Sequence, residues 1–234
     1  MKGLRPRPLS RALGILSRSR VKLLFEDDEL IVVEKPCGLL SIATAGERSK
    51  TLYAVLFDYV KRKRPAEKIF IVHRLDRDAS GLLVFAKSES AKRYLQQQFR
   101  NHSASRKYLA VVEGRLRQDC ETIQSFLTEN AAHRVYSVND PRKGRLAVTH
   151  LKVLKRSSQT TLVEVRLESG RKHQIRVHLT DYGHPILGDK IYGSRMNPIR
   201  RLALHAGSLS FVHPQTGERL HFESACPSSF LIAL

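Results

Sequence analysis

Short runs of apolar and β-branched residues, each of strand length, recur along this chain, and most are joined by connections too short for a helical crossover. Parallel neighbours need a crossover of a dozen or more residues, whereas antiparallel neighbours do not. The pattern therefore predicts an α+β fold with one large mixed, mainly antiparallel β-sheet flanked by helices and loops. The expected strands cover residues 21–26, 29–34, 69–72, 82–86, 107–112, 133–138, 146–154 and 160–167.

Apolar side chains at helical spacing predict three helices between these strands. In the first, Ser49 or Thr51 is suitable as the N-cap, and a basic last turn followed by Pro65 ends the pattern. In the second, Ser88 is suitable as the cap. The three segments are residues 51–63, 88–101 and 173–182.

The length of 234 residues suits one large domain. Residues 1–20 contain several arginines and serines and no acid, and they predict a basic N-terminal tail ahead of a single domain at residues 21–234. A transit peptide of an organelle has a similar composition. A tail that contacts RNA or only solvent, in a cytoplasmic protein, is the preferred interpretation.

The formal net charge of +19 exceeds what solubility requires. It indicates a polyanionic partner, and nucleic acid is favoured because lysine and arginine gain affinity for phosphates through the release of counterions. An anionic membrane surface is the second candidate, but no apolar run is long enough to span a bilayer, so no membrane partner is expected.

The three cysteines, Cys37, Cys120 and Cys226, stand far apart and form no CxxC pair. Neither a zinc site nor a disulfide framework is indicated, which fits a reducing compartment. His173, His178 and His184 are separated by five and six residues, a spacing that does not place metal ligands on one helical face. We therefore expect no metal.

The densest chemical segment, residues 73–83, reads HRLDRDASGLL between two strand-like runs. A loop carried by two buried strands is held rigidly. Asp76 stands there among arginines, which favour the ionised form that a nucleophile or base needs. An ion-paired surface loop without chemistry is the alternative at this point.

This segment resembles the HRLDxxTSGLL signature of the RluA family of pseudouridine synthases. Further segments resemble that family in the same order along residues 21–230, namely KPCG at 35–38, Lys107-Tyr108, SGRKHQIRVHL at 169–179, GHPILGD at 183–189 and RLALHA at 201–206. The chain departs from the family pattern at Ala79 and Ser169, where the family has threonine. Because the chain begins only a short tail before Val21, it resembles the shorter members, which lack an added N-terminal RNA-binding domain.

The resemblance implies an isomerase that converts uridines to pseudouridine. Asp76 matches the essential aspartate, which either attacks carbon 6 of the base or carbon 1′ of the ribose, or first abstracts a ribose proton. Arg176 matches its paired arginine, with phosphate binding as the alternative role. Tyr108 matches the tyrosine that lies against the target base, and on a strand it could instead be a core residue.

Arg74 matches the arginine that fills the RNA stack after the target base has flipped out. The RNA surface around the site is expected to include other basic residues, which are Lys35, Arg77, Lys107, Arg171 and Lys172. The isomerisation loses no atoms and exchanges no electrons, so no cofactor is required. The resemblance implies ribosomal or transfer RNA as the partner, no DNA, and a monomer as the simplest state.

Two other functions remain open on sequence grounds. The first is a catalytically silent RNA-binding protein on the same scaffold, which has no evident need of the Asp76, Tyr108 and Arg176 set. The second is a metal-dependent nuclease, which the absence of clustered acids near Asp76, apart from Asp78, disfavours.

Overall fold

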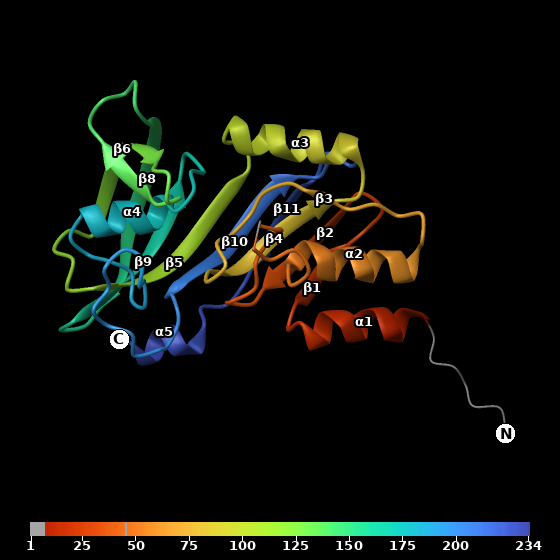
Figure 1. The fold of residues 1–234 in the computed structure, drawn as a ribbon, viewed down its shortest axis with the longest axis horizontal. Helices are drawn as coiled ribbons and strands as arrows, with labels where there is room; N and C mark the ends of the chain where they lie inside the picture. Colours follow the sequence, from red (N-terminus) through yellow and green to blue (C-terminus); the bar gives the residue numbers. More distant parts are fainter. Residues whose placement is uncertain (1–7, 45) are drawn as a thin grey trace. The chain divides into compact units, whose positions relative to one another are not determined.

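The computed structural model describes residues 8–44 and 46–234, which divide into two compact units (Figure 1). Unit 1 comprises the chain up to Phe99 together with Phe211–Leu220, and unit 2 comprises Arg100–Ser210 together with His221–Leu234. Strands β10 (Leu204–Val212) and β11 (Arg219–Glu223) each begin in one unit and end in the other.

Four strands lie wholly within the described part of unit 1, which are β1 (Lys22–Glu26), β2 (Leu30–Lys35), β3 (Phe70–Ile71) and β4 (Ser80–Ala86). β2 pairs antiparallel with β1 and with β4, and β3 pairs antiparallel with the end of β4. Every residue of β4 is buried. Because β4 directly follows the loop at residues 73–79, that loop is anchored in the core of the unit.

The helices of unit 1 are α1 (Pro8–Arg18), α2 (Leu52–Lys63) and α3 (Glu89–Arg100). Both expected caps are confirmed. The hydroxyl of Thr51 accepts a hydrogen bond from the backbone N–H of Ala54 at 3.1 Å, and the hydroxyl of Ser88 accepts one from Ala91 at 3.1 Å. Each cap satisfies a backbone N–H that the first turn of a helix leaves without an internal partner.

The segment expected to be a tail contains α1, which lies beside α2 (Figure 1). Residues 1–7 lie outside the described residues. Leu16 is only 2% exposed, and its carbonyl accepts the N–H of Val21. The expectation of a tail is therefore wrong for residues 8–18, because the arginines obscure a helical spacing of Leu9, Leu13 and Leu16. The single domain at residues 21–234 stays a prediction.

Unit 2 is built on an antiparallel run of strands in the order β10-β5-β9-β8-β6-β7. The bounds of the strands not yet given are Ser105–Glu113 for β5, Cys120–Glu129 for β6, Val135–Val138 for β7, Arg145–Arg156 for β8 and Thr160–Leu167 for β9. Strands β6, β10 and β11 were not expected from the sequence.

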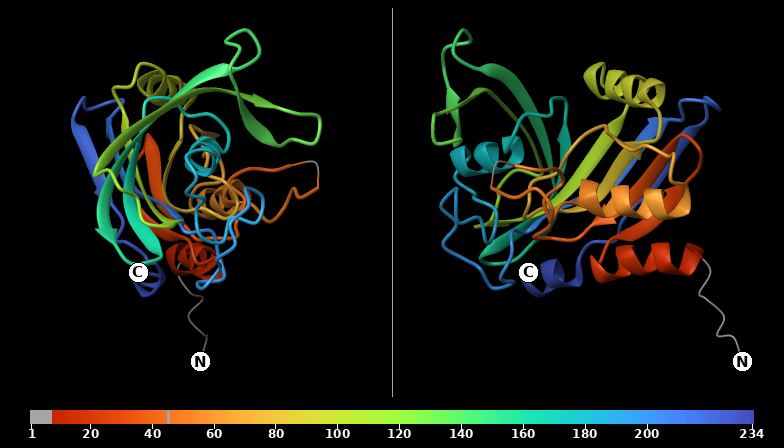
Figure 2. Two further views of the ribbon diagram at one scale, coloured as in Figure 1. Left: turned by 90° about the vertical axis from the view of Figure 1, so that its left-hand side faces the viewer. Right: turned by 45° about the vertical axis from the view of Figure 1, so that its right-hand side comes forward.

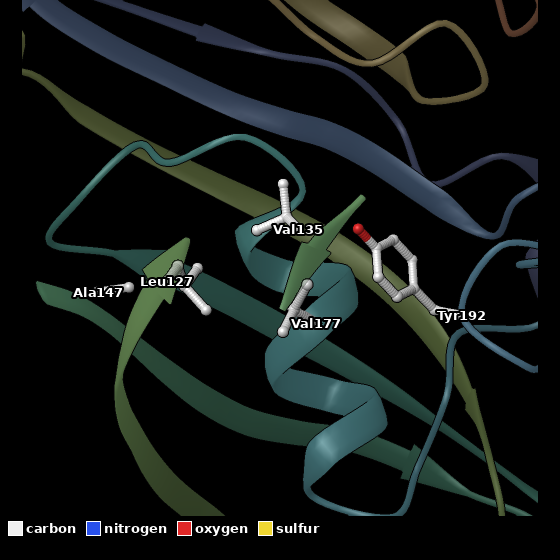
Figure 3. Close-up of a cluster of buried hydrophobic side chains, with 5 residues drawn as sticks. All are labelled: Leu127, Val135, Ala147, Val177 and Tyr192. Carbon is white, nitrogen blue, oxygen red and sulfur yellow. The ribbon is translucent and has the colours of Figure 1, made fainter. Parts of the chain in front are cut away.

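Helix α4 (Gln174–Asp181) packs against β6, β7 and β8 on one face of this sheet (Figure 2). Val177 of the helix belongs to a buried cluster with Tyr192 and residues of the three strands (Figure 3). The strand members of that cluster are Leu127, Val135 and Ala147. A short helix, α5 (Ser228–Ile232), ends the chain and buries Phe230.

The α+β class and the large, mainly antiparallel sheet are confirmed, since the strand pairings described within each unit are antiparallel. Within the described residues, no helix combines the length and the hydropathy that crossing a membrane requires.

Two glycines of unit 2 provide a matched test of backbone packing. Gly183 and Gly188 both have positive φ, at 86° and 75°. A Cβ at Gly188 would lie 2.2 Å from the carbonyl oxygen of Arg201, whereas nothing lies within 4 Å of one at Gly183. We expect Gly183→Ala to lower the free energy of unfolding by about 1 kcal/mol through backbone strain alone. Gly188→Ala should lower it by about 3 kcal/mol or more.

Urea denaturation of both variants beside the wild type measures these changes. Equal destabilisation by the two substitutions would contradict the close approach of residues 188 and 201.

Candidate active site

The loop between β3 and β4 presents Asp76 at the surface of unit 1. Asp76 is half-buried, while Arg74, Arg77 and Asp78 are exposed and Leu75 is buried. Leu75 is only 7% exposed, and its buried side chain anchors the segment to the interior of the protein. Asp76 therefore sits on a loop whose apolar side chain points inward and whose charged side chains are accessible.

The residues on both sides of Asp76 are held by hydrogen bonds from β2 and the loop that follows it. The buried hydroxyl of Ser41 donates to the carbonyl of Leu75 at 2.6 Å and accepts the N–H of Leu75 at 3.0 Å. The N–H of Gly38 donates to the carbonyl of Arg77 at 2.9 Å. The backbone around Asp76 is thereby fixed on each side by a segment more than thirty residues earlier.

Lys35 makes three further hydrogen bonds in this region. Its side chain is fully buried, and its ammonium donates to the carbonyls of Pro36 at 2.9 Å, Leu39 at 2.7 Å and Arg77 at 2.9 Å. The expectation that Lys35 lines the RNA surface is therefore wrong. A buried ammonium must have its three donors satisfied, and here they join the end of β2 to the loop of Asp76.

The exposure of Arg74 and Arg77 is compatible with their predicted contacts to RNA, and these roles stay predictions. His73, which precedes them, accepts the N–H of Val84 through Nε2 at 3.3 Å, and its ring packs on Phe99 at 4.8 Å between centroids. His73 thus has a structural role at the start of the loop. Ala79 at its end is 1% exposed.

In unit 2, Arg176 projects from α4 into a buried ion pair that the sequence analysis missed. Its Nε and Nη2 donate to the two carboxylate oxygens of Asp189 at 2.7 and 2.8 Å, and both side chains are at most 5% exposed. The carboxylate of Asp189 also accepts the N–H groups of Ile191 and Tyr192. Such a bidentate ion pair fixes the plane of the guanidinium. It uses only two of the five N–H donors of the group.

Tyr192 supports the same guanidinium from its flat side. The centre of the Arg176 guanidinium lies 5.0 Å from the centroid of the Tyr192 ring, within the range of cation–π attraction. The hydroxyl of Tyr192 shares a hydrogen bond of 2.9 Å with Nδ1 of His173, the residue just before α4. The sequence did contain a signal for Asp189 and Tyr192, because both follow closely after the family-like segment GHPILG. No role was assigned to these two residues from the sequence.

Tyr108 and Lys107 are neighbours on β5 and therefore point to opposite faces of the sheet. Tyr108 is 5% exposed and pairs with Val165, on the face that α4 covers. Lys107 is exposed and forms an ion pair with Glu164 at 3.3 Å. The structure thus places Tyr108 and Arg176 on one face of unit 2 and Lys107 on the opposite face of β5, and the predicted contact of Lys107 with RNA stays a prediction.

Arg171 and Lys172 lie just before α4. Arg171 is exposed, and its Nε donates to the carbonyl of Leu146 at 3.2 Å. Lys172 is half-buried and donates to Glu129 at 2.6 Å. Ser169, which replaces the family's threonine, keeps a useful hydroxyl, because it donates to Gln174 at 2.8 Å and accepts the N–H of Val148.

The three histidines considered as metal ligands have separate partners. His173 contacts Tyr192, and Nε2 of His178 lies 3.0 Å from the hydroxyl of Ser125. Nδ1 of His184 lies 2.7 Å from the carbonyl of Glu113 and therefore donates to it. Each histidine thus serves the packing of its own element.

Comparison with known proteins decides the family. The family model for RNA pseudouridylate synthases matches residues 29–181. The chain belongs to this family. The chain is 39% identical over 225 residues to an uncharacterized RNA pseudouridine synthase, YlyB, of Bacillus subtilis, covering 94% of this chain and 74% of that protein. The predicted resemblance to the RluA family of pseudouridine synthases is confirmed.

Two further relatives show how the chain compares in length and fold. It is 38% identical over 224 residues to the ribosomal large subunit pseudouridine synthase D of Nitrosomonas europaea, covering 92% of this chain but only 64% of that protein. The solved structure of human RNA pseudouridylate synthase domain containing 4 matches with a TM-score of 0.76 at 25% identity, covering 96% of this chain and 94% of that one.

Replacing Lys35 by methionine tests the clamp. Three carbonyls would lose their shared donor, so we expect the free energy of unfolding to fall by about 3 kcal/mol. Lys50→Met at an exposed position is the control and should change it by about 0.5 kcal/mol at most. Urea denaturation gives both values. If the two variants proved equally stable, the buried ammonium would not hold the loop.

The pH dependence of stability follows from two buried histidines of unit 2. Burial lowers the pKa of His178 to about 4 and that of His205 to about 4. Since the unfolded chain takes up these protons near the ordinary pKa of about 6.5, the stabilisation is complete above that pH and is lost as pH falls towards 4.

The free energy of unfolding, measured across this pH range, should fall as the pH is lowered. The slope should correspond to the uptake of up to one proton on unfolding for each of the two histidines. His178→Asn should remove its share of the slope. An unchanged slope in that variant would show that His178 is not buried in its neutral form.

Proposed function

We propose that this chain isomerises selected uridines of large-subunit ribosomal RNA to pseudouridine, with Asp76 as the reacting carboxylate. Membership of the family supports the reaction, and relatives named ribosomal large subunit pseudouridine synthases C and D support the choice of RNA. The structural observation that carries the proposal is the rigid presentation of Asp76. Its backbone neighbours are clamped by Ser41 and Lys35 while the residue stays partly exposed.

A rigid, accessible carboxylate is what the first step of this reaction requires. Asp76 either attacks carbon 6 of uracil, attacks carbon 1′ of the ribose, or removes a ribose proton. In each case the bond from N1 to carbon 1′ breaks and a bond from carbon 5 to carbon 1′ forms. The proton leaves carbon 5 and N1 gains one, so the atoms balance without a cofactor.

Two buried residues of unit 2 and one exposed arginine of unit 1 support the remaining predicted roles. Arg176 is held in one orientation by Asp189, which suits an arginine that has to meet a reacting carboxylate at a fixed angle. Tyr108 has an aromatic face suited to stacking on a uracil. Arg74 is exposed and planar, as insertion into an RNA stack requires.

An RNA-binding protein without catalysis is the competing function. The hydrogen bonds around Asp76 argue against it, because binding of phosphates needs cations and gains nothing from a clamped carboxylate, which repels the RNA backbone. Transfer RNA is the competing substrate.

Asp76→Asn tests the reaction, and Asp78→Asn is the matched control because it removes the same charge from an exposed position of the same loop. Unmodified large-subunit ribosomal RNA and transfer RNA are incubated separately with each protein, and pseudouridines are mapped by carbodiimide adducts. We expect modification of the ribosomal RNA by the wild type and by Asp78→Asn, and at least a thousandfold slower reaction with Asp76→Asn.

Binding of the same RNA by Asp76→Asn should be at least as tight as by the wild type, since the variant carries one less negative charge. Modification by Asp76→Asn at the wild-type rate would refute the role of Asp76. Modification of transfer RNA alone would refute the choice of substrate.

A further inference from the structure

A basic cleft of about 460 Å³ opens in unit 2 between β6, β7 and the start of β8. Its volume lies within the range of about 300–1,000 Å³ typical of ligand sites. Neither Tyr108 nor Arg176 lines it, so it is separate from the groups to which the proposed reaction assigns the base and the carboxylate. The cationic residues of its lining are Arg142, Lys143, Arg145, Arg171 and Lys172.

The wall of the cleft is a tight turn between β7 and β8. The carbonyl of Asp140 accepts the N–H of Lys143 at 3.0 Å, and its carboxylate accepts the N–H of Arg142 at 2.9 Å. Gly144 then passes so close to β7 and β6 that a Cβ would lie 2.8 Å from the side chain of Val138 in β7 and 2.9 Å from Cβ of Phe126 in β6. The turn therefore presents Lys143 on a backbone fixed at both sides.

The charge of the cleft is only partly compensated. Arg142 is paired with Asp140 at 3.1 Å, and Lys172 is paired with Glu129, the one acid in the lining, at 2.6 Å. The hydrogen bond from Lys172 lowers the pKa of Glu129, so this acid is ionised at neutral pH.

The other cations of the cleft carry charge without such compensation. Within residues 8–44 and 46–234, the side chains of Lys143 and Arg145 make no ion pair, and the side chain of Arg171 donates to the carbonyl of Leu146 without forming an ion pair. Lys143 and Arg145 are also exposed. Three cations thus face the same cleft with their charge available to an anion.

Helix α4 adds to this potential. It begins at Gln174, two residues after Lys172, and the N-terminal end of a helix carries a partial positive charge. His173 at the N-cap position provides no side-chain hydrogen bond to the helix. The dipole of α4 and the cationic side chains therefore both make the electrostatic potential near Lys172 more positive.

We propose that this cleft binds the phosphodiester backbone of the RNA substrate, outside the groups that hold the target uridine. The inference rests on the proposed function for the identity of the RNA. Several cations on a fixed turn suit successive phosphates of a chain, and contacts of this kind set the register of the RNA without reading its sequence. The cleft then contributes affinity that depends on salt concentration.

The double variant Lys143→Ala/Arg145→Ala tests the cleft by direct binding. Fluorescence anisotropy with labelled, unmodified fragments of large-subunit ribosomal RNA measures the Kd over a series of salt concentrations. We expect the Kd to rise about tenfold and the slope of log Kd against log salt to fall by about 1.5, since each lost phosphate contact removes about 0.7–0.9. Arg115→Ala/Arg117→Ala is the matched control, because it removes two exposed charges from unit 2 outside the cleft.

Glu129→Gln provides a test in the opposite direction. It removes the single acid of the lining and releases Lys172, so we expect it to tighten the binding of RNA about threefold. A variant that only disturbs folding does not gain affinity. Opposite signs for the two variants are therefore specific to an anion-binding cleft.

The inference fails if the cleft double variant loses no more affinity than the control pair, or if Glu129→Gln does not tighten binding. It also fails if these variants change the binding of uridine monophosphate but leave that of RNA unaltered. Its failure is distinct from that of the proposed function. A wild-type protein that binds RNA through the cleft but forms no pseudouridine refutes only the reaction.

Discussion

The position of Asp76 depends on one buried ammonium group. An unpaired charge in the interior costs several kcal/mol, so Lys35 is tolerated only because carbonyl oxygens surround its Nζ. One of these oxygens belongs to Arg77, the residue after Asp76. The last residue of β2 and the loop before β4 are thus joined by a contact that neither can lose without exposing buried polar groups. Ser41 completes the arrangement from the other side of Asp76.

Local signals in the sequence were sufficient for much of the fold. Thr51 and Ser88 were recognisable as helix caps because a cap depends on the residues that follow it directly. β6 escaped because its inward side chains include polar ones, such as Ser125, whose partner is His178 of α4. A strand that packs through hydrogen bonds lacks the apolar alternation that sequence analysis detects. Helix α1 was missed because residues 1–20 were assessed by their positive charge and not by the helical spacing of Leu9, Leu13 and Leu16.

For the candidate site, the sequence motifs indicate which residues to consider, whereas the burial and orientation of several of these residues are known only from the structure. The motifs pointed to Asp76, Tyr108 and Arg176, whose roles stay predictions, but they could not tell which lysines face outward. Lys35 is buried through tertiary contacts that a motif does not encode. The opposite orientation of Lys107 and Tyr108, in contrast, follows from the alternation of side chains along the predicted strand. Asp189 was missed for the same reason, since its partner lies thirteen residues earlier on a different element.

The alternation along β5 has a consequence for how this family can vary. Tyr108 and Lys107 serve opposite sides of the same strand, and the strand is hydrogen-bonded on both edges, to β9 and to β10. Inserting or deleting one residue just ahead of them would turn each side chain to the opposite face of the sheet. The ammonium group of Lys107 would then occupy the face on which the ring of Tyr108 lies. Length changes in homologous chains should therefore collect in the turns that flank β5 and spare the strand itself.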